Sequence, residues 1–182
     1  MNTMLDILGA TIIGGLIFLL ITNLNTYSSK DKFTSDTELT LQQNAKTLAS
    51  MIESDLRKVG YNYSGSPIID ADSSKFSFYA DIDSNGTVDS LTLTESDTTL
   101  LPETQNPKDR IYYRIVDGDT LKAASLGLTR LKFTYKDALG YVTTVPDSIQ
   151  YIEAEVWLES TSKIDTSYAK TYWEITVNPR NL

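Results

Sequence analysis

The sequence predicts an α+β protein in which a long N-terminal helix, apolar in its first half and amphipathic in its second half, packs on an antiparallel β-sheet. Three observations support this. Residues 7–21 are an uninterrupted apolar run, and apolar residues recur at helical spacing over residues 41–59. Within residues 61–182, apolar and polar residues alternate with the period of strands. We therefore expect an N-terminal helix with its polar connection over residues 1–34 and a globular domain over residues 35–182.

The composition restricts the chemistry that the chain can perform. Its 182 residues include 16 basic and 24 acidic side chains, a net charge of -8, which repels nucleic acids and anionic membrane surfaces. Cysteine and histidine are both absent, so the chain lacks thiol chemistry and the side chain that most readily transfers protons near neutral pH. We expect neither an enzyme nor a partner of nucleic acid.

The apolar run is expected to anchor the chain in a membrane. Residues 7–21 cover roughly 22 Å at ~1.5 Å per residue, so Met4, Leu5 and the polar ends must help to span the ~30 Å hydrocarbon layer. A cleaved signal peptide is the alternative, but it requires a basic stretch before the apolar run and a small-residue cleavage site. No Lys or Arg precedes Lys30, which favours the anchor.

Asp6 and three glycines set this helix apart from a plain anchor. A carboxylate at mid-bilayer costs about 2.5–3.5 kcal/mol, so Asp6 is expected either to lie hydrated at the membrane edge or to pair with a cation. The nearest chemical candidate is the α-amino group of a neighbouring copy. Gly9, Gly14 and Gly15 each cost about 1 kcal/mol in a helix but permit unwinding or close helix packing. These four residues are the candidate assembly residues, with glycines merely tolerated in an anchor as the alternative.

A second, amphipathic helix is predicted to follow. Ser35 and Glu38 have the spacing of a capping box, and Gly60 is expected to be the C′ residue that ends the helix. The apolar residues between them recur at spacings of three and four, which places them on one face: Leu41, Ala45, Leu48, Ile52, Leu56 and Val59.

A candidate calcium site lies in the first predicted hairpin. Alternating runs at 75–80 and 90–94 flank an acidic connection over 81–89. Within it, oxygen-bearing side chains follow the spacing of a calcium loop, with Gly86 at the bend. The candidate metal ligands are Asp81, Asp83, Asn85, Thr87 and Asp89. The twelfth position is Thr92 and not the usual glutamate, and the alternative is an Asn-Gly turn with solvated aspartates.

Two further strands are predicted to pair through their charges. Residues 130–136 place Arg130, Lys132 and Lys136 on one face, and residues 151–159 place a row of glutamates on one face. A basic face and an acidic face complement each other across neighbouring strands. We interpret the glutamates as part of a solvated sheet and not as catalytic carboxylates. A last strand is expected over 169–177.

The chain resembles the superfamily of type IV pilins and type II secretion pseudopilins, most closely the PilW-type minor pilins and the J-type pseudopilins. The resemblance rests on the order of elements and on three stretches, residues 54–62 (SDLRKVGYN), 78–86 (FYADIDSNG) and 126–135 (LGLTRLKFTY). It implies a pilin-like fold. It also implies that Asp6 neutralises the N-terminal amine of an adjacent subunit, although this chain has Asp where the family usually has Glu, and Asp6 is sixth when Met1 is counted.

The resemblance further implies a structural subunit of an extracellular type IV pilus-like filament, assembled through the N-terminal helix. Its partners would be copies of itself or other pilin-like subunits, and it would reside in the inner membrane before assembly. Two alternatives stay open: a minor pseudopilin of a type II secretion-like machine, and a monomeric, membrane-anchored calcium-binding or adhesive surface domain.

Overall fold

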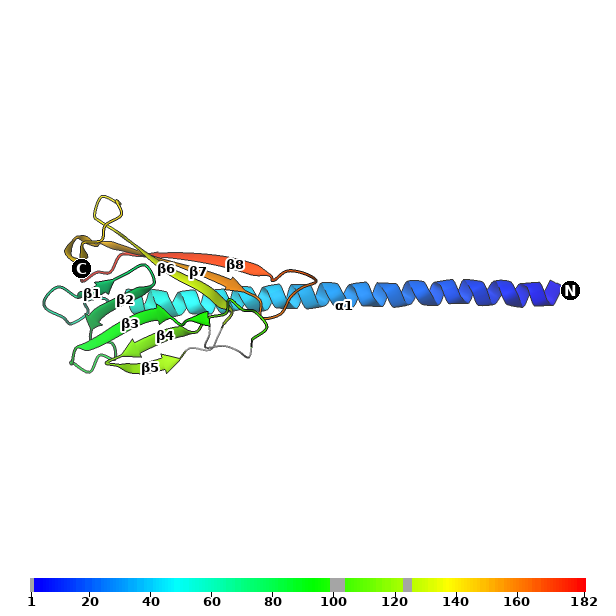
Figure 1. The fold of residues 1–182 in the computed structure, drawn as a ribbon, viewed down its shortest axis with the longest axis horizontal. Helices are drawn as coiled ribbons and strands as arrows, with labels where there is room; N and C mark the ends of the chain where they lie inside the picture. Colours follow the sequence, from blue (N-terminus) through cyan, green and yellow to red (C-terminus); the bar gives the residue numbers. More distant parts are fainter. Residues whose placement is uncertain (1, 99–103, 123–125) are drawn as a thin grey trace. The chain divides into compact units, whose positions relative to one another are not determined.

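The computed structural model describes residues 2–98, 104–122 and 126–182, and the predicted α+β class is confirmed. One long helix, α1 (Asn2–Leu56), precedes strands that form two antiparallel sheets (Figure 1). The chain divides into two compact units, Met1–Thr37 and Glu38–Leu182, whereas the sequence placed a boundary between residues 34 and 35. The first unit contains only helix, and the second contains the end of α1 and both sheets.

Helix α1 is continuous where the sequence predicted a polar connection and a second helix start. The expected capping box at Ser35 is wrong, because Ser35 lies inside α1. Neither glycine nor proline occurs between residues 22 and 56, so nothing in this stretch terminates the helix. Threonine hydroxyls can compete for the hydrogen bonds of a helix backbone. Here the hydroxyls of Thr34 and Thr37 donate to the carbonyl oxygens of Lys30 and Phe33, one turn earlier, and the helix continues.

The helix ends at Leu56, so the prediction that Gly60 is its C′ residue is also wrong. The chain tightens first, since the N–H of Lys58 donates to Asp55 O and that of Val59 donates to Leu56 O. Gly60 follows with φ +73° and donates its N–H to Tyr79 O. A side chain at Gly60 would place Cβ 2.6 Å from the carbonyl oxygen of Asn181, so this position requires glycine for its contact with the C-terminal segment.

The larger sheet has five strands in the order β1-β2-β3-β4-β5, each antiparallel to its neighbours. Its strands are β1 (Ile68–Ala71), β2 (Lys75–Ala80), β3 (Asp89–Glu95), β4 (Tyr112–Val116) and β5 (Asp119–Lys122). Strands β2 and β3 form the predicted hairpin, with Phe78 opposite Leu91 and Ala80 opposite Asp89. This register places both ends of the acidic loop next to each other.

The smaller sheet has three strands in the order β6-β7-β8, where one continuous sheet was expected. Its strands are β6 (Leu128–Lys136), β7 (Tyr151–Glu159) and β8 (Lys170–Val177), with a short 3-10 helix, η2 (Pro146–Ser148), between β6 and β7. The predicted charge pairing between β6 and β7 is confirmed. Lys132 Nζ lies 2.7 Å from Glu155 Oε2, and Lys136 pairs with Glu153.

The two sheets and the end of α1 share one hydrophobic core. The predicted helical face is buried, and so are alternate residues of the strand pairs β2–β3 and β6–β7. Large core side chains from the sheets include Phe76, Phe78, Leu91, Leu93, Leu131, Phe133, Ile152 and Val156. Each such side chain stabilises the fold by about 1.5–3 kcal/mol on burial.

Hydrogen bonds join β6 to the larger sheet at the edge of this core. The N–H of Phe133 donates to Ser73 O at 2.7 Å, and the hydroxyl of Tyr135 donates to Asp72 O at 2.7 Å. On α1, Asp55 accepts two hydrogen bonds from Arg114 of β4, at 2.9 and 3.1 Å. The helix is thus held to the larger sheet by a bidentate ion pair as well as by apolar contact.

Replacing Ile52 with alanine tests this core. Ile52 is fully buried, so we expect the free energy of unfolding to fall by about 2–5 kcal/mol. Leu39→Ala is the matched control on the same helix, because Leu39 is 56% exposed and surface substitutions change stability by about 0.5 kcal/mol or less. Urea unfolding of the full chain in detergent micelles measures both, and an equal loss in the two variants would contradict the buried face.

Candidate functional site

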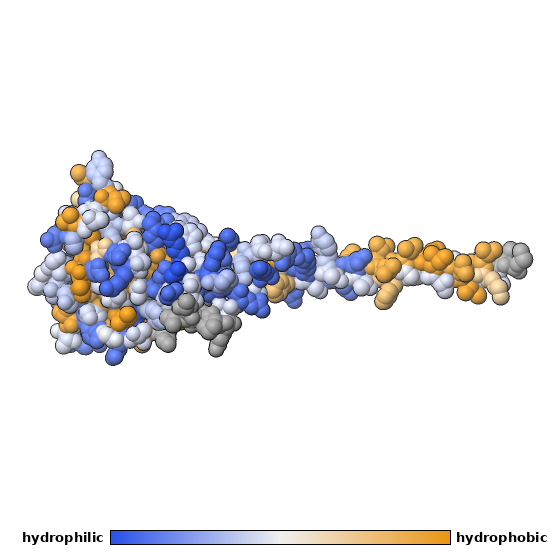
Figure 2. Space-filling model, viewed as in Figure 1, coloured by the Kyte–Doolittle hydropathy of each residue, from blue (hydrophilic) through white to orange (hydrophobic). Residues whose placement is uncertain are grey.

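The first half of α1 exposes its apolar side chains on all sides. The large apolar side chains between Met4 and Ile21 are 51% to 81% exposed, and Figure 2 shows this apolar surface beginning near the N-terminus. By length and composition, α1 contains a segment able to cross a membrane, and that segment is not buried within its own chain. Water is a poor solvent for such a surface, so lipid or protein must cover it.

The predicted assembly residues all lie on this part of α1. Gly9, Gly14 and Gly15 have helical backbone, and a Cβ added at any of them would meet nothing within 4 Å. Among the residues that the structure describes, no contact therefore requires glycine at these positions. Asp6 is exposed, and within the described parts of the chain no hydrogen bond or ion pair to its carboxylate is found.

The acidic loop between β2 and β3 is organised around Asp81, which is buried. Asp81 Oδ1 accepts the N–H of Asn85 at 3.0 Å, and Oδ2 accepts the N–H of Gly86 at 3.0 Å. The loop can wrap in this way because Ser84 and Gly86 adopt positive φ angles of 61° and 87°. The first predicted ligand is therefore also the structural centre of the loop.

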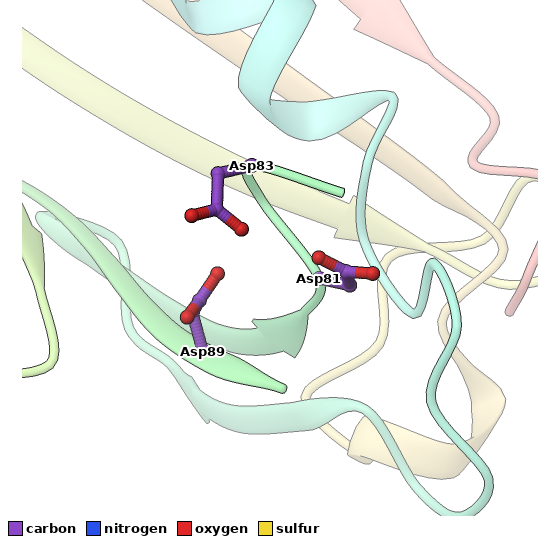
Figure 3. Close-up of side chains that lie close together, drawn as sticks. All are labelled: Asp81, Asp83 and Asp89. Atoms are coloured by element: carbon purple, nitrogen blue, oxygen red, sulfur yellow. The ribbon is translucent and has the colours of Figure 1, made fainter. Parts of the chain in front are cut away.

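Three of the predicted metal ligands come together. Asp81, Asp83 and Asp89 each offer a carboxylate oxygen, and these oxygens lie within 4.8 Å of one another. Figure 3 shows the carboxylates of Asp83 and Asp89 pointing toward each other, with Asp81 beside them. Asp89 also accepts the N–H of Ile82 at 2.9 Å. Clustered carboxylate oxygens of this kind can bind a metal ion, and hard cations prefer them.

The side chains of the other two predicted ligands are hydrogen-bonded within the loop. The amide nitrogen of Asn85 donates to Asp83 Oδ2 at 2.9 Å, while its Oδ1 accepts the N–H of Thr87 at 2.7 Å. The Thr87 hydroxyl also donates to Asn85. Thr92, at the twelfth position, is in β3 and shares a hydrogen bond with Ser77 at 2.8 Å, so it lies outside the loop.

Two residues that the sequence did not nominate also contact this loop. Asn62 donates its side-chain amide to Asp81 Oδ2 at 3.0 Å, and Lys58 donates its amino group to Ile82 O at 3.0 Å. Both follow the end of α1, so only the tertiary fold brings them here. A positive φ of 54° at Asn62 is allowed for asparagine more readily than for most residues. Lys58 adds a positive charge that opposes cation binding nearby.

The pKa of the Asp81 carboxyl is lowered from its ordinary value. The largest cause is the hydrogen bond from Asn62; burial acts in the opposite direction, and backbone N–H groups of Gly86, Asn85 and Ser84 lower the pKa further. Because the folded pKa is lowered, ionised Asp81 stabilises the fold above the pKa of the unfolded chain. This contribution disappears as the pH falls through the folded pKa.

Replacing Asn62 with glycine tests this account while preserving the positive φ. We expect the pKa of Asp81 to rise toward its ordinary value, because its strongest hydrogen bond is lost. The variant should be less stable than the native chain at neutral pH, and the difference should shrink as the pH falls through the pKa of Asp81. Carboxyl-carbon NMR titration and thermal unfolding across this pH range measure both effects. A pH-independent difference would show that Asn62 acts only through the backbone.

Compared with protein-family models, with curated proteins and with solved structures, the chain has no match in any of the three. Its own architecture is therefore the basis for comparison. A long N-terminal helix, apolar at its start, precedes antiparallel sheets that cover its amphipathic end. This architecture is pilin-like, and the apolar segment is compatible with a membrane anchor or a signal sequence.

Proposed function

We propose that the chain is a structural subunit of an extracellular type IV pilus-like filament, anchored in a membrane before assembly and assembled through α1. The observation that carries this proposal is the contrast along one helix. The apolar face of its second half is buried by its own sheets, whereas the large apolar side chains of its first half are exposed. A bundle of such helices from several copies would cover each of them, as lipid does beforehand.

The polar groups of this segment are compatible with both environments. Hydroxyls of Thr11, Thr22 and Thr26 donate to carbonyls one turn earlier, at 2.9 Å each. No threonine hydroxyl in this group therefore needs water as an acceptor, which matters where water is absent. Asp6 is the exception, and the amino terminus of a neighbouring copy would supply the cation that its carboxylate lacks.

Two related functions fit the same helix. A pseudopilin of a secretion machine would use α1 in the same way but would form only a short assembly. A monomeric anchored domain would keep α1 in lipid permanently. Electron microscopy of material sheared from cells separates a filament subunit from a pseudopilin by the length of the assemblies. Detergent extraction as a monomer identifies the monomeric anchored domain.

Substitution of Asp6 tests the filament proposal. Asp6→Ala should reduce sheared polymers at least tenfold, because losing one partner of a charge pair shielded from water costs about 2–5 kcal/mol. The membrane-bound amount should stay unchanged, and Asp6→Glu should restore polymers. Asp31→Ala is the matched control, since Asp31 is an exposed acid on the same helix. Immunoblotting and electron microscopy measure the polymers, and unchanged polymers in Asp6→Ala would contradict the role of Asp6.

We further propose that the acidic loop binds Ca²⁺ weakly. The specific observation in favour is the convergence of Asp81, Asp83 and Asp89 within 4.8 Å. Ca²⁺ takes six to eight oxygen ligands, so waters and backbone carbonyls would have to complete the shell around these carboxylates. Incomplete protein ligation of this kind corresponds to the dissociation constants of about 0.1–1 mM found in extracellular modules.

Thermal unfolding in calcium tests this second proposal. At about 10 mM Ca²⁺ such a site would stabilise the fold by about 1.4–2.7 kcal/mol and raise Tm by about 3–10 °C. Asp83→Asn should abolish the rise, because Asp83 is an exposed ligand whose loss leaves buried Asp81 in place. Asp119→Asn makes the same charge change on an exposed position of β5 and should keep the rise. No stabilisation of the native chain by calcium would reject the site.

A further inference from the structure

A hollow on the globular unit gathers positive charge on a chain that is acidic as a whole. Its volume is about 440 Å³, and Thr98, Lys108 and Arg110 line it together with residues of the three strands of the smaller sheet. Four of its lining residues are cations, Lys108, Arg110, Arg130 and Lys170, whereas Glu159 is its one acid among the described residues. We name this site the basic hollow. Because the chain carries a net charge of -8, such local enrichment departs from the average surface.

Part of this charge is already neutralised within the protein. Arg110 Nη1 lies 3.2 Å from Glu95 Oε1 and donates to Ser96 O at 3.0 Å, so its charge is already paired at the end of β3. Lys108 and Lys170 instead share a single oxygen, Glu159 Oε1, at 3.4 and 3.5 Å. One carboxylate therefore faces two amino groups. Their side chains are 63% and 67% exposed, which leaves both free to turn toward a ligand.

Glu159 is held ionised in this arrangement. Burial alone would raise the pKa of its carboxyl, but a hydrogen bond from Asn106 and the charges of Lys108 and Lys170 outweigh burial and lower the pKa. Asn106 lies 3.1 Å from Glu159 Oε2 and is itself buried. The fixed carboxylate positions the two lysines at the rim of the hollow but cannot neutralise both.

Arg130 adds a third cation that lacks a salt bridge to any described carboxylate. Its guanidinium lies over the ring of Trp157, 5.1 Å from the centroid, and Tyr172 packs against the same indole at 5.2 Å. An aromatic contact therefore holds the arginine in place, and its charge also acts on the carboxyls of Glu95 and Glu155 without a salt bridge. Together with Lys108 and Lys170, it leaves the hollow with an excess of positive charge over Glu159.

The remaining lining groups suit a sugar ring. Trp157 lines the hollow with its indole, and Thr98, Thr129 and Thr171 add hydroxyls. The hydroxyls of Thr98 and Thr129 donate to Asp97 and to Trp157 O, at 3.3 and 3.1 Å, so they offer a ligand their acceptor oxygens. Aromatic surface packs against the C–H faces of sugars, hydroxyls exchange hydrogen bonds with sugar hydroxyls, and ammonium or guanidinium groups bind a carboxylate. A volume of about 440 Å³ lies within the range of small-molecule sites. We propose that the basic hollow binds a carboxylate-bearing sugar.

This proposal is independent of filament assembly. All lining residues belong to the unit Glu38–Leu182, so the site would be present in a single subunit as well as in a polymer. A sugar carboxylate would take up the lysine charge that Glu159 leaves uncompensated, while the ring would lie along the exposed part of Trp157. Binding would weaken as salt rises, because exposed charges are screened.

NMR of the full chain in detergent micelles tests the proposal through its two tryptophans, Trp157 and Trp173, assigned with Trp173→Phe. Glucuronate should shift the Trp157 indole signal saturably at low salt, whereas glucose and inorganic phosphate should bind at least about threefold more weakly. Lys170→Gln should weaken glucuronate binding about three- to tenfold, the effect of losing one partly screened charge contact. Lys75→Gln is the matched control, because Lys75 is a half-exposed lysine paired with Asp70 on the larger sheet.

Each outcome of this titration either supports or overturns a carboxylate-sugar site in the basic hollow. Saturable binding of glucuronate that is lost selectively in Lys170→Gln supports the site. Absence of a saturable shift, or equal weakening in Lys75→Gln, would overturn it. Binding of glucose as tight as that of glucuronate would show that the cations do not select the ligand, and equally tight binding of phosphate would show that the hollow does not recognise the ring.

Discussion

The apolar surface of α1 must be removed from water, and the two halves of the helix require different solutions. The arrangement of the sheets depends on the second half, and the need for lipid or other chains depends on the first. From Leu41 onward, a single face is apolar, and two sheets can cover one face. Between Met4 and Ile21, apolar side chains surround the helix, so no sheet on one side could bury them. The same chain therefore contains one segment that its own fold completes and one that needs lipid or other chains.

The β body is built to bury the helical face from two directions. Hydrogen bonds from Phe133 and Tyr135 of β6 join the smaller sheet to the larger one. Arg114 of β4 forms a salt bridge with Asp55 on the helix. A buried pair of this kind is costly to break, since either partner alone would be a desolvated charge. The apolar contacts supply the stability of this unit, and the ion pair and the cross-sheet bonds define which faces meet.

The two candidate ligand sites, the acidic loop and the basic hollow, each gather charged side chains at the surface of the globular unit. The acidic loop closes the β2–β3 hairpin, and its buried Asp81 is satisfied by backbone N–H groups and by Asn62. The basic hollow lies where Lys108 and Arg110 meet the smaller sheet, and its lysines share one buried glutamate. One site has excess acid and the other excess base, so the proposed ligands are opposite in charge.

The sequence by itself determined the elements whose signals are local. The spacing of Leu41, Ala45 and Leu48 identified the buried helical face, and strict alternation identified the β2–β3 hairpin and the matched charges of β6 and β7. The continuation of α1 through Ser35 is also local, because neither glycine nor proline interrupts residues 22–56 and a capping pattern does not start a helix inside an uninterrupted one. Only the tertiary structure decided that the strands split into two sheets, that Asn62 reaches Asp81, and that Lys108, Arg130 and Lys170 surround one hollow. These residues are far apart in the chain, and only long-range packing brings them together.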